Sequence, residues 1–532
     1  MGIITDLPDH HGLPSKALIQ FFNQIEQLNL QVNTFMLLQN GRATAQFWRP
    51  PYRKECPQLL FSLSKTFTSI AVGIARDRGW LELEDPVISF FPDKLPETIS
   101  PNLAKMTIHH LLCMNAGHQH NIYPYVEREE DWVKAFLSQD VEHEPGTYYR
   151  YSTHSSYMLS AIIEKVTGQN LVDFLMPTLF EPLDIPRPAW ETCPLGITAG
   201  GMGLSLRTED IAKFGVMLLN NGMYEGNRIV SEDYLKMATA EQSDNRAGAS
   251  RIDSAQGYGY QIHLCRRGCY RGDGAFGQLC FVAPKENIVV AATSSFKSGG
   301  CLQTLLNLIF EHILDPLDKS VTVRKSATVH ESTTARESAT VREDYMELQS
   351  LLAKIGGNPA AAHAPFPAER PAELPILHDY SYRLPMIAHN STYTMSQNSA
   401  GIKTIRFLCR EDGARKLQLI GHDLNRIIPF DFSKPVHTRD FYHKDLSKTW
   451  QEVVIYASLN NESTLVLTLY YIETPYVVTY TFIFKGQAVE FQCDINVSMN
   501  NQSMNQSAYS INGQRNTAVR DKIHIHQVER QE

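Results

Sequence analysis

The spacing of apolar and polar residues predicts a helix and a β-hairpin at the start of the chain. Apolar residues recur at helical spacing over 16–29, and the apolar run 33–39 is typical of a strand. Asn40-Gly41 follows directly and is a strong hairpin turn signal. Residues 43–48 are therefore expected to return as the paired strand.

The same mixture of patterns continues to residue 315. Helical patterns cover 62–79, 154–167 and 301–314. Apolar runs typical of adjacent buried strands lie at 279–283 and 288–293. Helices that pack around an antiparallel sheet account for this alternation. We therefore expect residues 1–315 to form one α+β domain.

Residues 376–497 have a different pattern, in which short apolar segments alternate with polar, turn-like stretches. β-Branched and aromatic residues dominate these segments, which read TIRFLCR, LQLIG, EVVIYASL, STLVLTLYYI, YVVTYTFIF and AVEFQCDINV. Such regularly spaced strands are typical of an antiparallel sandwich or barrel. A second, all-β domain is expected here.

Two stretches lack a core-forming pattern. Residues 316–375 combine a near repeat, SATVHE at 326–331 and SATVRE at 338–343, with a Pro/Ala-rich part, and only 344–355 has a helical pattern. This composition is typical of a low-complexity linker. The tail 498–532 is rich in Asn, Gln and Ser at its start and is expected to be disordered.

Composition narrows the class of protein. The net charge of −8 and the lack of a long basic stripe favour neither nucleic acid nor an anionic membrane as partner. The nine cysteines form no CxxC pair, which suggests free thiols in a reducing compartment. The first residues lack a signal-peptide pattern, and no apolar run of about 20 residues occurs. We expect a cytoplasmic protein.

The most informative short segment is Ser62-Leu63-Ser64-Lys65. Residues three apart on a helix share one face, so Lys65 lies within reach of Ser62. A lysine that is partly neutral can take the proton of a serine hydroxyl and make it a nucleophile. The tetrapeptide alone is weak evidence for catalysis, because a serine helix cap beside a solvated lysine has the same sequence pattern.

Three later segments give this tetrapeptide a context. They are HEPGTYYRYST at 143–153, GITAGGMGLSLRTEDIAKFG at 196–215 and YRGDGAFGQLCFVAP at 270–284. In this order and spacing the chain resembles the serine beta-lactamase-like hydrolases, over roughly residues 15–315. That family includes AmpC-type beta-lactamases, penicillin-binding proteins, family VIII esterases and D-aminopeptidases. The resemblance implies a beta-lactamase/transpeptidase-like fold.

The resemblance also implies roles for individual residues. Ser62 matches the serine that the family acylates, and Lys65 and Tyr151 match its proton-transfer partners, without deciding which is the principal base. Thr153 stands where the family usually has asparagine, which puts amide binding in doubt.

The third family motif is aligned with Ala275-Phe276-Gly277. Ala275 lacks the cation that helps relatives bind the carboxylate of beta-lactams, which argues against an efficient beta-lactamase. Arg266, Arg267 or Arg271 can supply charge instead, although a lone arginine is more often a surface residue. The backbone N–H groups of Ser62 and Gln278 are expected to hold the oxyanion, with Gly277, Phe276 and Thr153 lining the substrate site.

The expected function is a serine hydrolase that cleaves a small ester or short peptide through an acyl-enzyme, without metal or other cofactor. His109, His110, His118 and His120 suggest a zinc site, but no aspartate follows in a ligand pattern. The alternatives are a non-catalytic acyl-binding or penicillin-binding sensor, and a scaffold whose β-domain binds proteins. A small molecule or short peptide is the expected partner, and homo-oligomerisation stays open.

Overall fold

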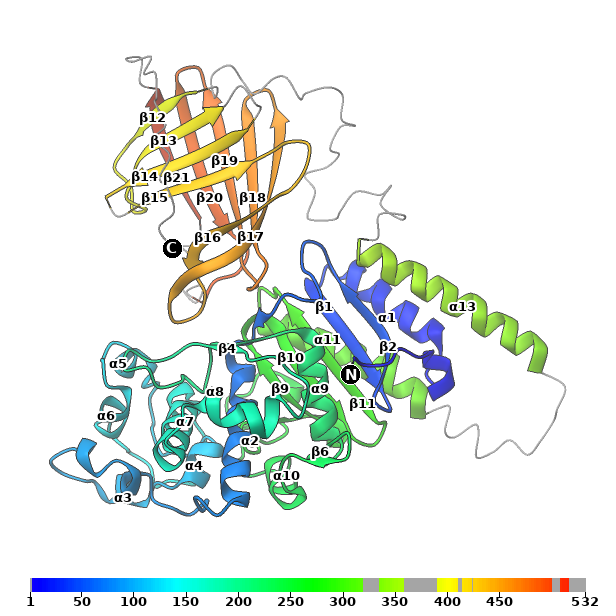
Figure 1. Ribbon diagram of the computed structural model, residues 1–532, viewed down its shortest axis with the longest axis vertical. Coiled ribbons are helices and arrows are strands. Elements are labelled where there is room, and N and C mark those ends of the chain that lie inside the picture. Colours follow the sequence, from blue (N-terminus) through cyan, green and yellow to red (C-terminus); the bar gives the residue numbers. More distant parts are fainter. Residues whose placement is uncertain are drawn as a thin grey trace. The chain divides into compact units, whose positions relative to one another are not determined.

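The structure is a computed structural model that describes residues 2–318, 334–357, 390–409, 414–422, 424–499 and 508–515. These residues form two compact units (Figure 1). The first unit contains the described residues up to 357 together with Phe441–Thr449 and Ile472–Pro475. The second unit contains the other described residues from 390 onward. The first unit therefore takes in two short segments from late in the sequence.

A six-stranded antiparallel sheet forms the centre of the first unit. Its order is β2 (Arg42–Trp48), β1 (Val32–Gln39), β11 (Ile288–Ser294), β10 (Gln278–Ala283), β9 (Tyr270–Gly274) and β8 (His263–Leu264). The predicted hairpin is confirmed, because β1 pairs with β2 across a turn in which Asn40 and Gly41 both have positive φ. The predicted α+β class is confirmed as well.

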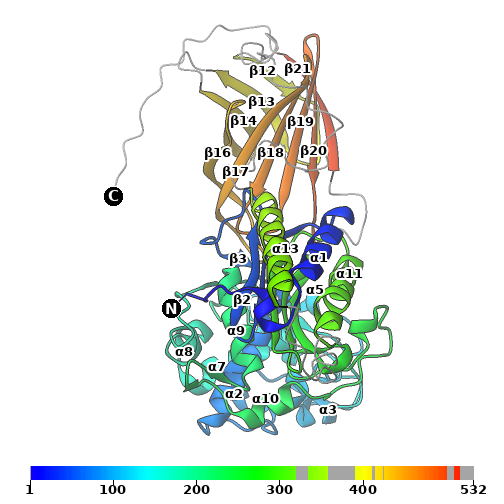
Figure 2. The ribbon, with the colours of Figure 1, turned by 90° about the vertical axis from the view of Figure 1, so that its right-hand side faces the viewer.

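Alternation along β1 divides the core into two layers. Phe35 and Leu37 face one layer, and Met36 and Leu38 face the other. The first layer is covered by α1 (Ser15–Gln27), α11 (Gly299–Ile309) and α13 (Thr334–Ile355), which gather on one side of the sheet (Figures 1 and 2). The second layer is covered by α2 (Ser64–Asp77), α9 (Thr208–Leu219) and the smaller helices.

The smaller elements of the first unit complete the second layer. Its other helices are α3 (Pro101–Lys105), α4 (Ile108–Leu112), α5 (Tyr123–Val126), α6 (Trp132–Leu137), α7 (Thr153–Thr167), α8 (Leu171–Leu175) and α10 (Glu232–Ala238). Its short strands are β3 (Gln58–Leu59), β5 (Leu204–Leu206), β4 (Ala189–Trp190), β6 (Met223–Tyr224) and β7 (Asn227–Arg228).

Helix α13 differs from the expectation of a short helix within a linker. It starts ten residues earlier than predicted, and Leu348, Leu352 and Ile355 are buried in the layer that contains α1. Apolar side chains at a spacing of three and four form one helical face, so burial against α1 stabilises the helix. The rest of the predicted linker, 319–333 and 358–375, lies outside the described residues.

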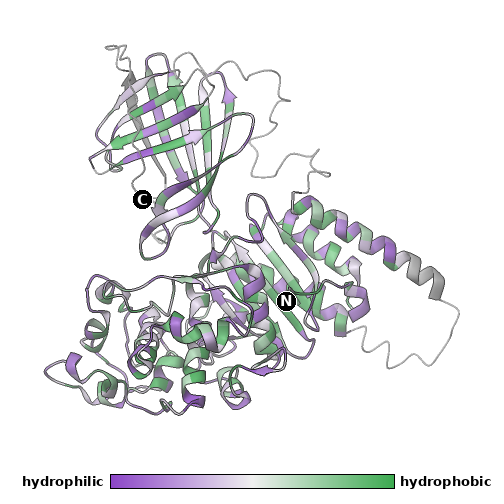
Figure 3. Cartoon of the chain, viewed as in Figure 1, coloured by the Kyte–Doolittle hydropathy of each residue, from purple (hydrophilic) through white to green (hydrophobic). Residues whose placement is uncertain are grey.

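The second unit is one ten-stranded antiparallel sheet. Its strands, in spatial order, are β15 (Asn425–Phe430), β14 (Arg415–Gly421), β13 (Ile402–Cys409), β12 (Thr392–Met395), β21 (Ala508–Arg515), β20 (Ala488–Ile495), β19 (Val477–Lys485), β18 (Thr464–Tyr471), β17 (Lys448–Asn461) and β16 (Val436–His443). Hydrophobic and hydrophilic residues alternate along several of them (Figure 3). All six predicted strand segments lie in this sheet.

One strand falls where a disordered tail was expected. Ala508–Arg515 forms β21, which pairs with β12 on one side and β20 on the other. Two paired neighbours satisfy the backbone groups of this polar segment, which its own composition did not reveal. Residues 500–507 and 516–532 of the predicted tail lie outside the described residues.

The sheet of the second unit curls around a buried polar group. The Arg426 guanidinium on β15 donates to the hydroxyls of Tyr480 on β19, at 2.8 Å, and Tyr471 on β18, at 2.9 Å. It also pairs with Asp440 on β16, which accepts from Tyr471 at 2.6 Å. Strands from both ends and the middle of the sheet therefore meet in its interior.

Among the described residues, no helix is long and apolar enough to cross a membrane.

We expect Leu348→Ala to destabilise the first unit by about 2–5 kcal/mol, the usual cost of emptying a buried leucine site. Urea unfolding is followed by tryptophan fluorescence in a Trp450→Phe background, because the other four tryptophans belong to the first unit. Met346→Ala is the control, since Met346 is 64% exposed, and should cost about 0.5 kcal/mol or less. Equal small effects would show that α13 does not stabilise this unit.

Candidate active site

The backbone presents Ser62 at the junction between β3 and α2. Ser62 lies in a single 3₁₀ turn, Phe61–Leu63, and the α-helix begins two residues later than predicted, at Ser64. Phe61 has a φ of +49°, a left-handed conformation that costs energy for a non-glycine residue. Ser62 is partly exposed, whereas Phe61 and Leu63 on either side are buried. The turn thus directs this serine side chain toward solvent from an otherwise buried segment.

The Lys65 ammonium is buried and has three oxygen neighbours. Its Nζ donates to Ser62 Oγ at 3.0 Å, to Thr153 Oγ1 at 3.3 Å and to the Gly201 carbonyl at 2.6 Å. An ammonium group has three N–H donors, so these bonds use all of them. Lys65 is only 1% exposed. This excludes the alternative of a serine helix cap beside a solvated lysine.

Burial shifts the protonation equilibrium of this lysine. Loss of water lowers the pKa of Lys65 to about 7, against the opposing charges of Asp445 and Asp273, which raise it. A sizeable fraction of Lys65 is therefore a neutral amine at neutral pH. A neutral amine 3.0 Å from a serine hydroxyl can accept its proton.

Tyr151 approaches the same two residues from the end of the segment before α7. Its ring centroid lies 5.0 Å from Lys65 Nζ, and its hydroxyl hydrogen-bonds with Ser62. Desolvation raises the pKa of Tyr151 well above its usual range, although the bond to Ser62 works in the opposite direction. Tyr151 is thus a neutral phenol beside Ser62, and 36% of its surface is exposed.

Strand β9 passes directly against the turn that carries Ser62. A Cβ atom on Gly274 would lie 2.0 Å from the Leu60 carbonyl, and one on Gly272 would lie 2.4 Å from Thr66 Oγ1. Only glycine allows this approach of two backbones. The glycines of YRGDG therefore bring the end of β9 to the candidate nucleophile.

The residues aligned with the third motif form the turn after β9. Ala275–Gly277 is a 3₁₀ turn, in which Phe276 has a φ of +64° and packs edge-on against Phe61. Gln278 is the first residue of β10, where its backbone pairs with Gly274 and its side chain donates to the carbonyls of Ala275 and Ser294. Phe276 thus lies next to the Ser62 turn, whereas the Gln278 side chain is occupied by two backbone carbonyls.

The three arginines proposed as alternative cations are all paired. Arg267 binds Glu286, Asp315 and Asp318, and Arg266 binds Asp253. Arg271 is 1% exposed, so the interpretation of it as a surface residue is wrong. It donates to Asp273 at 2.6 Å.

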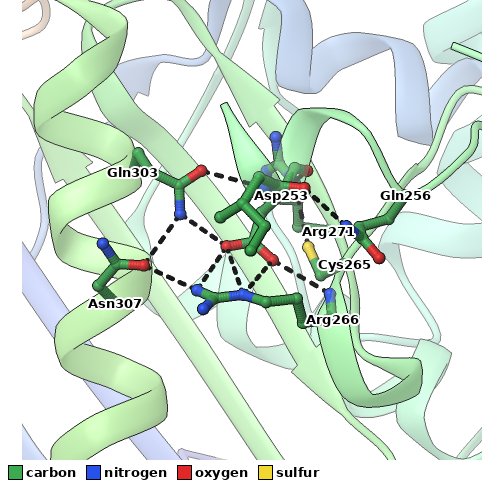
Figure 4. Close-up of polar contacts among 8 residues, drawn as sticks. Asp253, Gln256, Cys265, Arg266, Arg271, Gln303 and Asn307 are labelled. Carbon is green, nitrogen blue, oxygen red and sulfur yellow. Dashed lines mark hydrogen bonds and ion pairs between the residues drawn. The ribbon is translucent and has the colours of Figure 1, made fainter. Parts of the chain in front are cut away.

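A polar network beneath β9 holds Arg271 in place. Arg271 Nη1 donates to the Asp253 carbonyl at 2.6 Å and to Cys265 Sγ at 3.1 Å. The Asp253 carboxylate in turn accepts from Arg266 and from Gln303, which reaches it from α11 (Figure 4). Burial works to raise the pKa of Asp273, but the charge of Arg271 outweighs it and keeps that pKa low. Asp273 is therefore an anion near Lys65.

The histidines of the suggested zinc site serve separate structural roles. His110 Nδ1 accepts from the Thr107 backbone at 3.1 Å and caps α4, whereas His109 hydrogen-bonds with Tyr260 at 2.9 Å. His118 is buried against Phe136 and stays neutral, because desolvation lowers its pKa to about 4.

Sequence reasoning missed three groups near Lys65. Asp273 could have been found, because Arg and Asp two apart on a strand share one face and can pair. Gly201 contributes only a carbonyl, which no side-chain motif indicates. Asp445 comes from Phe441–Thr449, nearly 400 residues from Lys65, and only the tertiary structure brings it there.

A helix-flanked antiparallel sheet with a serine, a buried lysine and a tyrosine at one site defines a serine hydrolase of the beta-lactamase-like class. The chain belongs to the beta-lactamase family, because that family's model matches residues 33–311. Just over half of the chain is covered by this match. The resemblance stated from the motifs is thereby confirmed, as is the assignment to serine hydrolases.

Individual relatives are distant. A 6-aminohexanoate-dimer hydrolase from Paenarthrobacter ureafaciens is 24% identical over 286 residues, covering 50% of this chain and 72% of the relative. A family VIII carboxylesterase structure is 16% identical with a TM-score of 0.44 and covers 59% of this chain and 99% of its own. An octameric penicillin-binding protein homologue from Pyrococcus abyssi is 16% identical with a TM-score of 0.44. The match covers 90% of this chain and 97% of the homologue.

We expect Arg271→Gln to destabilise the first unit by about 3–5 kcal/mol, because it leaves the Asp273 carboxylate buried without its cation. Adding Asp273→Asn should recover a large part of that loss, since it removes the unpaired charge. Urea unfolding in the Trp450→Phe background measures both. Arg246→Gln, at an exposed pair with Glu241, is the control and should cost about 1 kcal/mol or less. Additive losses in the double variant would contradict this account of the pair.

Proposed function

We propose that this protein hydrolyses a small ester or a short peptide amide through an acyl-enzyme formed on Ser62. The observation that carries the proposal is the 3.0 Å hydrogen bond between Ser62 Oγ and the buried Nζ of Lys65. In its neutral form Lys65 takes the Ser62 proton as Oγ attacks the substrate carbonyl. Water then attacks the acyl-enzyme, and the acid is released as Ser62 regains its proton.

Tyr151 serves as a proton carrier in this scheme. Its raised pKa makes the phenolate inaccessible near neutral pH, so it does not start the reaction as a base. As a neutral phenol beside Ser62, it can pass a proton to the leaving group while it accepts one from the Lys65 side. The geometry thus favours Lys65 as the principal base of the two residues.

The developing oxyanion needs backbone N–H donors. We propose the N–H of Ser62 as the first and place the second at Ala275, where β9 ends against the Ser62 turn. The earlier candidate, Gln278, lies one strand further away and pairs with Gly274 on β9. Thr153 joins the site through its hydrogen bond with Lys65, and Phe276 joins it through its ring contact with Phe61.

The charges around the site favour esters and amides over beta-lactams. A beta-lactam carries a carboxylate that needs a cation, but Arg266, Arg267 and Arg271 are all paired with acidic groups. Asp273 and Asp445 would repel a second anion. The similar protein from Paenarthrobacter ureafaciens is likewise named as a hydrolase, of the 6-aminohexanoate dimer.

A fluorophosphonate probe should label Ser62, as shown by mass mapping of the labelled peptide. Ser62→Ala should lower kcat for 4-nitrophenyl butyrate by at least about 1,000-fold, because it removes the nucleophile. Ser89→Ala, at an exposed serine, is the matched control and should leave both labelling and turnover intact.

Three results would contradict the proposal in different ways. Labelling of Ser64 instead of Ser62 would show that the nucleophile is misassigned. Labelling of Ser62 without turnover of any ester or anilide would favour the non-catalytic acyl-binding alternative. Cephalosporin turnover equal to ester turnover would show that the paired arginines do not exclude anionic substrates.

The rate should rise with pH across an acidic limb centred near pH 7. kcat/KM for the neutral ester reports the free enzyme, in which Lys65 must lose its proton, and the pKa of Lys65 is lowered to about 7. Below the limb, kcat/KM should fall about tenfold per pH unit. His154 and His263 do not account for it, because desolvation lowers their pKa values to about 3 and 4.

Asp445 could imitate this limb, since burial raises its pKa to about 7 as well. In Asp445→Asn the limb should persist and move to lower pH, because a negative charge that raises the pKa of Lys65 is gone. Disappearance of the limb in Asp445→Asn would assign it to the carboxyl group instead of to the lysine.

A further inference from the structure

A tight turn just before β8 holds a buried glutamine in a strained conformation. The turn is closed by the bond from the Gly259 N–H to the Ile262 carbonyl at 2.9 Å. Gln261, within it, has a φ of +59°, a left-handed conformation that is rare for a residue with a side chain. Only 2% of Gln261 is exposed. Such a conformation persists where the surrounding contacts hold it in place.

The contacts of Gln261 reach three helices. Its side-chain Nε2 donates to the carbonyls of Leu111, at 3.0 Å, and Leu112, at 2.8 Å, at the end of α4. Its Oε1 accepts from Ser156 Oγ on α7 at 2.5 Å. Its backbone carbonyl accepts from Thr66 Oγ1 on α2 at 3.1 Å. One residue therefore joins α2, α4 and α7 through a polar network in which its side-chain amide is fully used.

The two hydroxyls that Gln261 binds lie beside catalytic groups. Thr66 directly follows Lys65 on α2, and Ser156 lies one helical turn after Thr153 on α7, so it shares a face with Thr153. Lys65 Nζ donates to Thr153 Oγ1 at 3.3 Å across the same pair of helices. Gln261 thus ties α2 to α7 next to the contact between Lys65 and Thr153.

The turn that contains Gln261 also packs against Tyr151. Tyr258 lies edge-on to the Tyr151 ring with centroids 6.3 Å apart, and His263 stacks on that ring with centroids 6.1 Å apart. The position of this turn therefore bears on both groups that handle protons beside Ser62.

We propose that Gln261 is a positioning residue for the Ser62 reaction, because it holds α2 against α7 and so keeps water from the Lys65 amine. This inference rests on the proposed function, in which neutral Lys65 is the base. Without the glutamine amide, Ser156 loses this acceptor and α7 loses its link to α2, so water can enter between the helices. Water favours the charged form of Lys65 and raises its pKa, which burial lowers to about 7.

Gln261→Met tests this, because it keeps the length of the side chain and removes its hydrogen bonds. The acidic limb of kcat/KM for 4-nitrophenyl butyrate should move to higher pH by about one unit or more. At pH 7 the rate should fall about tenfold, and near pH 9 it should approach that of the wild type, because Lys65 then loses its proton. Asp273 and Asp445, whose charges act on Lys65, and the neutral His154 are left unchanged.

Gln39→Met is the matched control, since Gln39 is also 2% exposed and its Nε2 donates to the His11 carbonyl at 2.9 Å, on β1. It should leave the limb near pH 7. Circular dichroism checks that each variant is folded. Ser156→Ala removes only the link to α7 and should move the limb in the same direction, which keeps the test open if Gln261→Met does not fold.

Two results would overturn the inference while leaving the hydrolase standing. One is a loss of rate by the same factor at every pH in Gln261→Met, which would make Gln261 a purely structural residue. The other is a limb that stays at its wild-type position in Ser156→Ala as well as in any folded Gln261→Met. A wild-type protein that hydrolyses no ester would refute the proposed function on which the inference rests.

Discussion

The burial of one amine, that of Lys65, is the constraint on which the catalytic unit depends. An ammonium group can leave water only where its donors find acceptors, and here those are a serine, a threonine and a carbonyl from three separate segments. Ser62 lies in the turn before α2, Thr153 begins α7, and Gly201 lies between β4 and β5. Each of these segments must be held in place. The fold thereby produces a base with a pKa near neutrality from a residue that is ordinarily charged.

Much of the fold was predictable because its signals are local. The Asn40-Gly41 hairpin, the paired runs that became β10 and β11, and the strand series after residue 376 all follow from spacing over ten residues or fewer. The prediction was wrong where a polar segment is held by its neighbours. The segment that forms β21 has a composition typical of a linker or tail, and it becomes a strand through pairing with β12 and β20 that the sequence does not display.

For the candidate site, the sequence motifs indicated Ser62, Lys65 and Tyr151, which lie close together in the structure. These residues could be named because each belongs to a motif with a known place in the order of segments. It did not name the acidic groups. Asp273 was overlooked although its partner Arg271 was considered, since an arginine in isolation gives no sign of burial. Asp445 could not be found at all, because its place depends on a turn fixed by the side chain of Glu191, over 250 residues earlier.

The membership of Phe441–Thr449 and Ile472–Pro475 in the first unit has a consequence for biosynthesis. A ribosome adds about 5–20 residues per second, and domains generally fold as they emerge. The six-stranded sheet of the first unit can form once β11 has been made, but the unit stays incomplete until residue 475 has left the exit tunnel. A nascent chain would therefore hold Lys65 with Asp445 still missing for several seconds, and a ribosome that stalled before residue 441 would release a hydrolase fold without its acidic turn.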